Sequence, residues 1–183
     1  MKIIVINGVA RSGKDSFVNA CMKSTYNDVY SISSIDKIKE LAKQIGWDGK
    51  KDERGRRLLS DLKDALTLYD DIPFKTIIKE INNILFTYSQ FEQPTDNIII
   101  FVFSREPEEI QRWVDEYNAK TLLIRRDVEE EFDNHADRNV FNFDYDYVYS
   151  NIHDLKQLEK DAINFIDFIG KSKWSSKGPE LRI

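Results

Sequence analysis

Five short apolar runs alternate along the chain with stretches in which apolar residues recur at helical spacing. The first run, residues 2–6, is unbroken and ends at Asn7-Gly8, which predicts a strand buried on both faces. Similar runs predict four further strands, at residues 29–32, 98–103, 121–124 and 145–149. Because helical segments separate the strands, the pattern indicates an α/β fold: a five-stranded parallel sheet with right-handed crossovers and helices on both faces.

Helical periodicity predicts where the rest of the core lies. Apolar stripes predict helices over residues 14–23 and 154–170, and three more within residues 35–45, 58–66 and 77–88. We expect these three to form a helical insertion, residues 33–94, inside one domain that spans residues 1–170. The remaining residues, 171–183, contain several serines, a glycine and a proline, and we expect a frayed tail or a strap there.

The segment between the first strand and the first helix carries the most specific motif of the chain. It has a glycine, four residues and then glycine-lysine, and reads Gly8-Val9-Ala10-Arg11-Ser12-Gly13-Lys14-Asp15-Ser16. Its place after a buried strand and before a helix is the one that phosphate binding needs, because backbone N–H groups then converge at the positive end of the helix. The two glycines allow a tight turn. The motif predicts binding of a nucleoside triphosphate by Gly8, Ala10, Arg11, Ser12, Gly13, Lys14, Asp15 and Ser16.

Lys14 is the residue that we expect to contact the β- and γ-phosphates and to follow the charge during transfer. ATP with Mg²⁺ is the expected cofactor pair. A serine or threonine hydroxyl usually helps to hold the metal at the position after the lysine, where this chain has Asp15. We therefore expect Asp15 and Ser16 to be the residues nearest the metal.

The motif also carries a family resemblance. The run Arg11-Ser12-Gly13-Lys14-Asp15-Ser16 resembles the phosphate loop of the bacteriophage deoxynucleoside monophosphate kinases and that of the animal-type phosphomevalonate kinases, both of which have aspartate after the lysine. The whole chain resembles the nucleoside monophosphate kinase group of P-loop folds. Residues 143–151 are similar to the last strand of guanylate kinases and dephospho-CoA kinases, and residues 46–53 and 104–110 resemble a group of bacterial P-loop proteins. The resemblance implies a three-layer P-loop fold with an acceptor-binding insertion and a lid.

Residues that follow the other strands are candidates for the acceptor, because ligands of open parallel sheets collect at the carboxyl ends of the strands. A phosphorylated acceptor favours arginine, whose planar fork binds phosphate with two hydrogen bonds. We expect Arg56 or Arg57 to bind the acceptor phosphate, with a solvated basic face as the alternative. Arg105 follows the third strand, after Ser104, which stands where the phage enzymes carry an aspartate. The full candidate set is Ser33, Lys37, Arg56, Arg57 and Arg105.

Arginines at the end of the fourth strand are candidates for catalysis. Arg125 and Arg126 lead into residues 126–140, where the kinase group has its lid, and Arg138 lies near the far end of that segment. Lid arginines of such enzymes neutralise the phosphoryl group as it moves, which is most of what a phosphotransferase contributes. With Lys14, these three arginines form the predicted catalytic set. Many acidic residues lie between them, so the lid either faces solvent or is vestigial.

Composition narrows the function classes. The chain has 183 residues, 41% hydrophobic and 32% charged, and a net charge of −5, which argues against general attraction to nucleic acid or to an anionic membrane. The only cysteine, Cys21, cannot form a disulfide within the chain, and no apolar run is long enough to span a membrane. Without a recognisable leader, we expect a cytoplasmic protein whose partner is a small phosphate acceptor.

Three functions fit these residues. The first is a kinase that transfers the γ-phosphate of ATP to a nucleoside or deoxynucleoside monophosphate. The second is a nucleotide-binding sensor or inactive kinase relative, which Asp15, Ser104 and the acidic lid segment favour. The third is a kinase of a non-nucleotide phosphorylated metabolite, which the phosphomevalonate-type loop permits.

Overall fold

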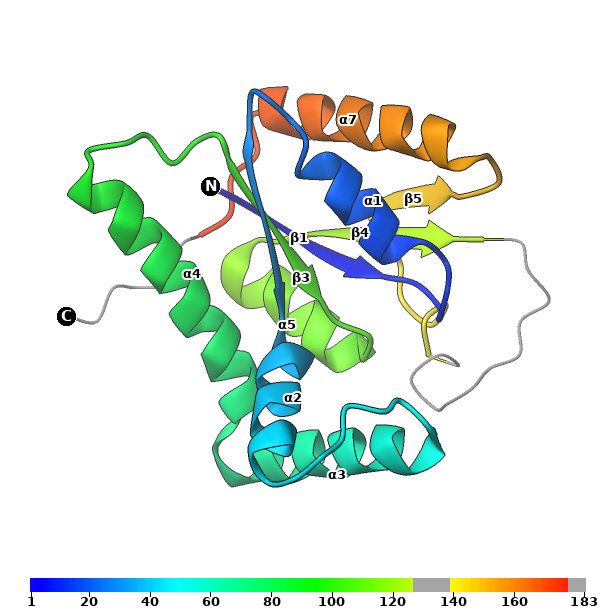
Figure 1. The fold of residues 1–183 in the computed structure, drawn as a ribbon. Helices are drawn as coiled ribbons and strands as arrows, with labels where there is room; N and C mark the ends of the chain where they lie inside the picture. Colours follow the sequence, from blue (N-terminus) through cyan, green and yellow to red (C-terminus); the bar gives the residue numbers. More distant parts are fainter. Residues whose placement is uncertain (127–138, 178–183) are drawn as a thin grey trace. The chain divides into compact units, whose positions relative to one another are not determined.

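The computed structural model describes residues 1–126 and 139–177, and Figure 1 draws its ribbon. These residues divide into two compact units. The first contains residues 1–31 and the described residues from 92 onward, and the second contains Ile32–Phe91. A single domain over residues 1–170, with an insertion at residues 33–94, stays a prediction.

A five-stranded sheet forms the centre of the first unit, with the strand order β2-β3-β1-β4-β5. β1 (Lys2–Asn7) pairs in parallel with β3 (Ile98–Phe103) and β4 (Lys120–Arg125), and β4 pairs in parallel with β5 (Tyr147–Ser150). β2 (Asp28–Ser33) lies at the other edge and ends in the second unit. All six residues of β1 are buried, because the strand has a neighbour on each edge and covered faces.

Helices cover both faces of this sheet (Figure 1). α1 (Lys14–Cys21) packs with α7 (Leu155–Lys171) against one face, where their apolar side chains share a core with Ile4 and Ile6. α5 (Pro107–Tyr117) contacts β1 and β4 from the other face. Successive side chains of a strand point to opposite sides, so each strand supplies side chains to both helical layers. The predicted α/β class, with a five-stranded sheet between two helical layers, is confirmed.

The last strand begins two residues later than its pattern predicts. Residues 145–149 alternate as a strand does, yet β5 pairs with β4 only from Tyr147 onward. The reason is a set of three hydrogen bonds between Asp146 and Thr121, each of which involves a side chain. Thr121 N and Oγ1 each donate to Asp146 Oδ2 at 2.9 Å, and Asp146 N donates to Thr121 Oγ1 at 2.8 Å. Side-chain bonds thus replace the ladder at the start of the strand.

Asp146 makes the free energy of unfolding depend on pH in the acidic range. Burial alone raises the pKa of this carboxyl, but the bonds from Lys120 (2.6 Å) and Thr121 outweigh burial and hold the pKa below its ordinary value. An acid with a lowered folded-state pKa stabilises the fold fully above its unfolded pKa, and that contribution is lost as the pH falls through the folded value. Because the Asp146 carboxylate is partly exposed to solvent, which screens its ion pair, we expect Asp146→Asn to cost only about 1 kcal/mol at pH 7 and to flatten the loss of stability below about pH 4.

Urea unfolding of the wild type and the variant from pH 7 to pH 2 measures this effect. Asp144→Asn is the matched control, because Asp144 is a carboxylate of the same segment and the bonds from Lys120 and Thr121 go to Asp146 instead. Equal acid sensitivity of the wild type and Asp146→Asn would contradict the assignment.

The chain after α7 is a strap as far as residue 177. Ser176 N donates to Met1 O at 3.1 Å, and Ile3 N donates to Ser176 Oγ at 2.8 Å. Lys177 N donates to Tyr117 O at 2.9 Å. Since β4 pairs with β1 only from Ile4 onward, the strap supplies the partners that the first residues of β1 lack on that edge.

Three helices form the second unit: α2 (Ser34–Gln44), α3 (Glu53–Asp70) and α4 (Ile72–Gln90). They pack on one another, and Ile38, Ala42 and Leu59 form a buried cluster between α2 and α3. Asp52 caps α3 by accepting a bond from Gly55 N at 2.8 Å. The three predicted helical stripes are therefore confirmed as helices.

In the described parts of the chain, we find no helix with the length and apolarity that crossing a membrane requires.

Candidate functional site

The segment Gly8–Ser16 turns tightly from β1 into α1, and its two glycines stand where no side chain fits. Gly8 has φ +151°, and a Cβ there would collide with the Ile124 carbonyl oxygen and lie 2.7 Å from Ser12 Oγ. Gly13 has φ +99°, and a Cβ would collide with Asn151 Nδ2. A third residue, Arg11, adopts a left-handed φ of 63° with an exposed side chain. The loop is therefore a strained, closely packed turn, a conformation that concentrates at ligand sites.

The first N–H groups of α1 lie where this loop meets the helix. The first helical bond of α1 runs from Phe17 N to Gly13 O at 2.9 Å, and Gly13 has no side chain to cap the helix. Helical geometry gives the N–H groups of Asp15 and Ser16, in the first turn, no partner inside the helix. The positive end of the helix dipole lies at the same place. This end of α1 is consequently suited to bind an anion.

The Lys14 ammonium group lies across the loop. Its Nζ donates to Gly8 O and to Val9 O, the latter at 2.7 Å. The side chain is only partly buried, so its charge lies at the edge of the cradle rather than inside the core. A phosphate held by the loop N–H groups would meet this charge directly.

Ser12 is the best indication that the loop fits a phosphate group. Its side chain is fully buried, and its Oγ has no hydrogen-bond partner among the described residues. A buried hydroxyl without a partner costs free energy, which a phosphate oxygen in the loop would recover. The Ser12 backbone is already held, because Ser12 N donates to Val9 O at 3.2 Å and Ser12 O accepts from Asn151 Nδ2 at 2.8 Å.

Asn151 is a site residue that the sequence pattern does not indicate. It follows β5, is buried, and bonds the phosphate loop through its side chain and Arg125 O through its backbone N–H at 2.6 Å. The only sequence signal is a predicted strand that ends in Ser-Asn shortly before a helix cap. Its position shows that the carboxyl ends of β1, β4 and β5 meet at the phosphate loop.

Asn7, the last residue of β1, is a second site residue outside the predicted set. Its Oδ1 accepts from Gly8 N at 2.8 Å, and its Nδ2 donates to Tyr145 OH at 2.8 Å and to Arg105 O at 3.3 Å. Tyr145 OH in turn donates to Val140 O at 2.7 Å. The start of the loop is thereby tied to two other segments at the same edge of the sheet.

The residues after β3 lie at this edge, as the sequence predicts. Ser104 is buried, and its Oγ donates to Glu109 Oε2 at 2.9 Å. This hydroxyl therefore ties the end of β3 to the first turn of α5. Arg105 is half-buried, and its carbonyl accepts the bond from Asn7.

Arg125, the last residue of β4, and Arg126, which follows it, are both exposed. The Arg125 guanidinium lies 5.9 Å from the centre of the Phe141 ring, a cation–π distance. Arg126 is the last described residue before the gap, and Arg138 lies outside the described residues. Ser33, Lys37, Arg56 and Arg57 belong to the second unit and stay predictions as acceptor-binding residues. Arg57 pairs with Asp61 on α3, at 3.7 Å.

The predicted metal residues lie in the first turn of α1. Asp15 and Ser16 are both exposed there. No group of three or more His, Cys, Asp or Glu side chains suited to a metal occurs within residues 1–126 and 139–177. Mg²⁺ that is bound to nucleotide phosphates needs only one or two protein ligands. The carboxylate oxygens of Asp15 and the hydroxyl oxygen of Ser16 suit that arrangement.

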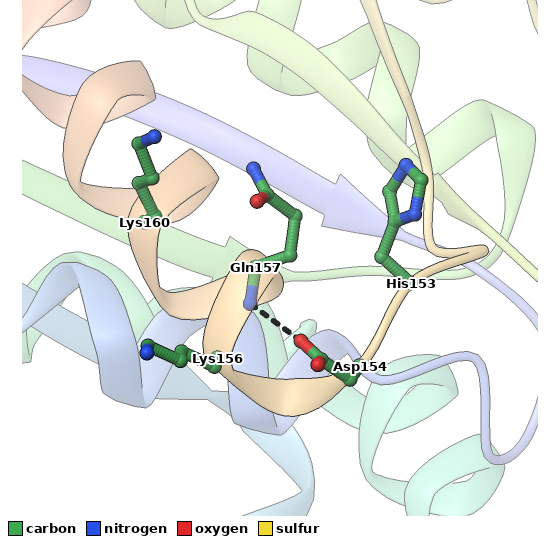
Figure 2. A pocket seen from close by; sticks show the side chains of 5 residues that line it. All are labelled: His153, Asp154, Lys156, Gln157 and Lys160. Atoms are coloured by element: carbon green, nitrogen blue, oxygen red, sulfur yellow. Dashed lines mark hydrogen bonds between the residues drawn. The ribbon is translucent and has the colours of Figure 1, made fainter.

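A separate hollow opens at the start of α7, as Figure 2 shows. Its lining residues come from α7 and the two positions before it: His153, Asp154, Lys156, Gln157 and Lys160. Asp154 Oδ1 accepts from Gln157 N at 2.9 Å, so the helix start is already capped. None of these residues belongs to the segment Gly8–Ser16.

Comparisons with known proteins find likenesses among solved structures. No family model and no curated protein matches the chain. Among solved structures, it is similar to a dephospho-CoA kinase from Campylobacter jejuni, with 14% identity, a TM-score of 0.47 and coverage of 93% of this chain and 98% of that one. It is also similar to a shikimate kinase from Aquifex aeolicus, with 13% identity, a TM-score of 0.43 and coverage of 91% and 97%. A sugar kinase from Janibacter sp. HTCC2649 matches with 11% identity, a TM-score of 0.44 and coverage of 91% and 95%. At these values, none of the likenesses assigns a ligand or an activity to this chain.

Proposed function

We propose that this protein binds ATP with Mg²⁺ at Gly8–Ser16 and transfers the γ-phosphate to a nucleoside or deoxynucleoside monophosphate. The observation that carries the proposal is the phosphate loop itself. A strained turn presents the first N–H groups of α1, with Lys14 across its edge and the unsatisfied Ser12 hydroxyl inside. Each of these features suits bound phosphate.

The reaction needs little covalent chemistry from the protein. A phosphate oxygen of the acceptor attacks the γ-phosphorus, the bond from that phosphorus to the β–γ bridging oxygen breaks, and ADP leaves with the electron pair. Mg²⁺ would neutralise charge on the β- and γ-phosphates. Lys14 would hold the same phosphates. We expect Arg125 and Arg126, at the carboxyl end of β4, to stabilise the transferring group, and Arg105, after β3, to contact the acceptor or a phosphate.

One observation favours the alternative of a nucleotide sensor without transfer activity. The residue directly after β3, which is an aspartate in the phage-type enzymes, is Ser104 here, and its hydroxyl donates to Glu109 Oε2 at 2.9 Å. Such a protein would bind ATP through the same loop and respond without turnover. The third possibility, a kinase of a non-nucleotide phosphorylated metabolite, shares the loop and differs only in the acceptor.

A phosphotransfer screen tests the proposal. ADP formation is followed with ATP·Mg²⁺ and a panel of nucleoside monophosphates, deoxynucleoside monophosphates, coenzyme precursors and phosphorylated metabolites. Turnover of a monophosphate nucleotide supports the proposal, and turnover of another metabolite alone supports the third possibility. If ATP binds in a Lys14-dependent manner and no acceptor is turned over, the kinase proposal is wrong and the sensor is favoured.

A further inference from the structure

Tyr145 lies in the first unit just ahead of β5, and its hydroxyl joins two segments that meet at the phosphate loop. We infer that the Asn7–Tyr145 pair is a positioning element that holds the phosphate loop in its binding geometry. The inference rests on the proposed nucleotide-binding function. It goes beyond it by assigning a role in that binding to two residues outside the loop motif.

The bonds around Asn7 have one consistent direction. Because Asn7 Oδ1 accepts the Gly8 N–H, the Nδ2 group must face Tyr145 and donate to its hydroxyl. The phenol oxygen then has its own hydrogen left, which it donates to Val140 O at 2.7 Å. Rotation of the Asn7 amide would break the bond from Gly8, and the Tyr145 hydroxyl could then donate to Asn7 only by giving up its bond to Val140.

Apolar packing supports the same connection. Val9 of the phosphate loop forms a small cluster with Leu123 of β4 and Val140, and the Tyr145 ring packs against it. Asn7 is buried as well, so its bond with Gly8 lies in a low-dielectric region, while the two bonds of the Tyr145 hydroxyl are partly buried. Burial also raises the pKa of Tyr145 to about 12, although the bond from Asn7 lowers it, so the hydroxyl keeps its proton at neutral pH.

The Asn7–Tyr145 pair stabilises the backbone geometry at the start of the loop Gly8–Ser16. Gly8 begins the loop, and its N–H direction is set by Asn7. Displacements near 1 Å at a binding site are enough to change rates by orders of magnitude. The hydrogen bonds that connect Gly8, through Asn7 and Tyr145, to Val140 therefore affect phosphate binding directly, in addition to their contribution to stability.

Tyr145→Phe tests the inference, because it removes a single oxygen and leaves the ring packing in place. We expect the Kd for ATP·Mg²⁺ in calorimetry to rise about tenfold, the equivalent of one buried hydrogen bond. Amide exchange at Gly8 should become faster at the same time. Tyr149→Phe is the matched control: it removes a tyrosine bond to Asp161 (3.1 Å) on the other side of the sheet and should leave the Kd within about twofold.

A double-mutant cycle with Asn7→Ala sharpens the result. If the pair acts as one unit, Asn7→Ala should weaken ATP binding less in the Tyr145→Phe background than in the wild type. Two outcomes overturn the inference: an unchanged Kd in Tyr145→Phe with only reduced thermal stability, or strictly additive effects. Failure of the proposed function is a different result, because then the wild type itself would not bind ATP, or Lys14→Ala would bind it equally well.

Discussion

Replacement of Lys14 by alanine is expected to reduce phosphoryl transfer about 10²–10³-fold, the usual cost of removing one preorganised charge-stabilising group. The reason is the position of the ammonium group, which spans the loop from α1 to the carbonyls of Gly8 and Val9. Its loss removes the positive charge that faces bound phosphates. Initial rates of ADP formation, measured with the acceptor found in the screen, give the size of the effect, and calorimetry gives the change in ATP affinity.

Lys23→Ala is the control for this prediction. Lys23 follows the same helix and pairs with Glu159 at 2.8 Å on the exposed surface. Exposed pairs of this kind contribute about 0–1 kcal/mol, so the variant should keep ATP affinity and turnover within about twofold. Equal losses in Lys14→Ala and Lys23→Ala would mean that Lys14 has no special role.

Gly8→Ala is expected to have the largest effect on folding and to abolish nucleotide binding. The substitution combines two costs: an unfavourable backbone conformation at φ +151° and a collision with the Ile124 carbonyl oxygen, which belongs to β4 and cannot move freely. We expect a loss of about 3 kcal/mol or more, since the conformation alone costs about 1–3 kcal/mol. Thermal unfolding and ATP calorimetry on the same sample measure both consequences.

Gly46→Ala separates the two costs. Gly46 has φ +103°, yet a Cβ there meets nothing within 4 Å, so only the conformational part applies. This variant should lose about 1–2 kcal/mol and bind ATP normally. If Gly8→Ala were no more destabilised than Gly46→Ala, the close packing of the phosphate loop on β4 would be contradicted.

The amino-acid sequence predicts those features that local pattern determines. The strand β1 and the start of α1 at Lys14 are predicted correctly, because strand, turn and helix signals follow one another in this part of the sequence. The helical stripes of the second unit are equally clear. The predicted start of β5 is wrong, because residues 145 and 146 continue the alternating pattern while side-chain bonds between Asp146 and Thr121 take the place of the backbone ladder there.

The supporting residues of the site cannot be predicted in this way. Asn7 and Asn151 act through partners 138 and 139 residues away in the chain, and no local pattern indicates which buried amide will meet which loop. Contacts of this kind depend on the tertiary fold, in which the carboxyl ends of the strands meet.

A crystal structure with a non-hydrolysable ATP analogue and Mg²⁺ tests the central claim most directly. We predict β- and γ-phosphate oxygens within hydrogen-bond distance of the N–H groups of Gly13–Ser16, of Lys14 Nζ and of the Ser12 hydroxyl. Nucleotide bound elsewhere on the chain, with Gly8–Ser16 in contact with no phosphate, would contradict this claim.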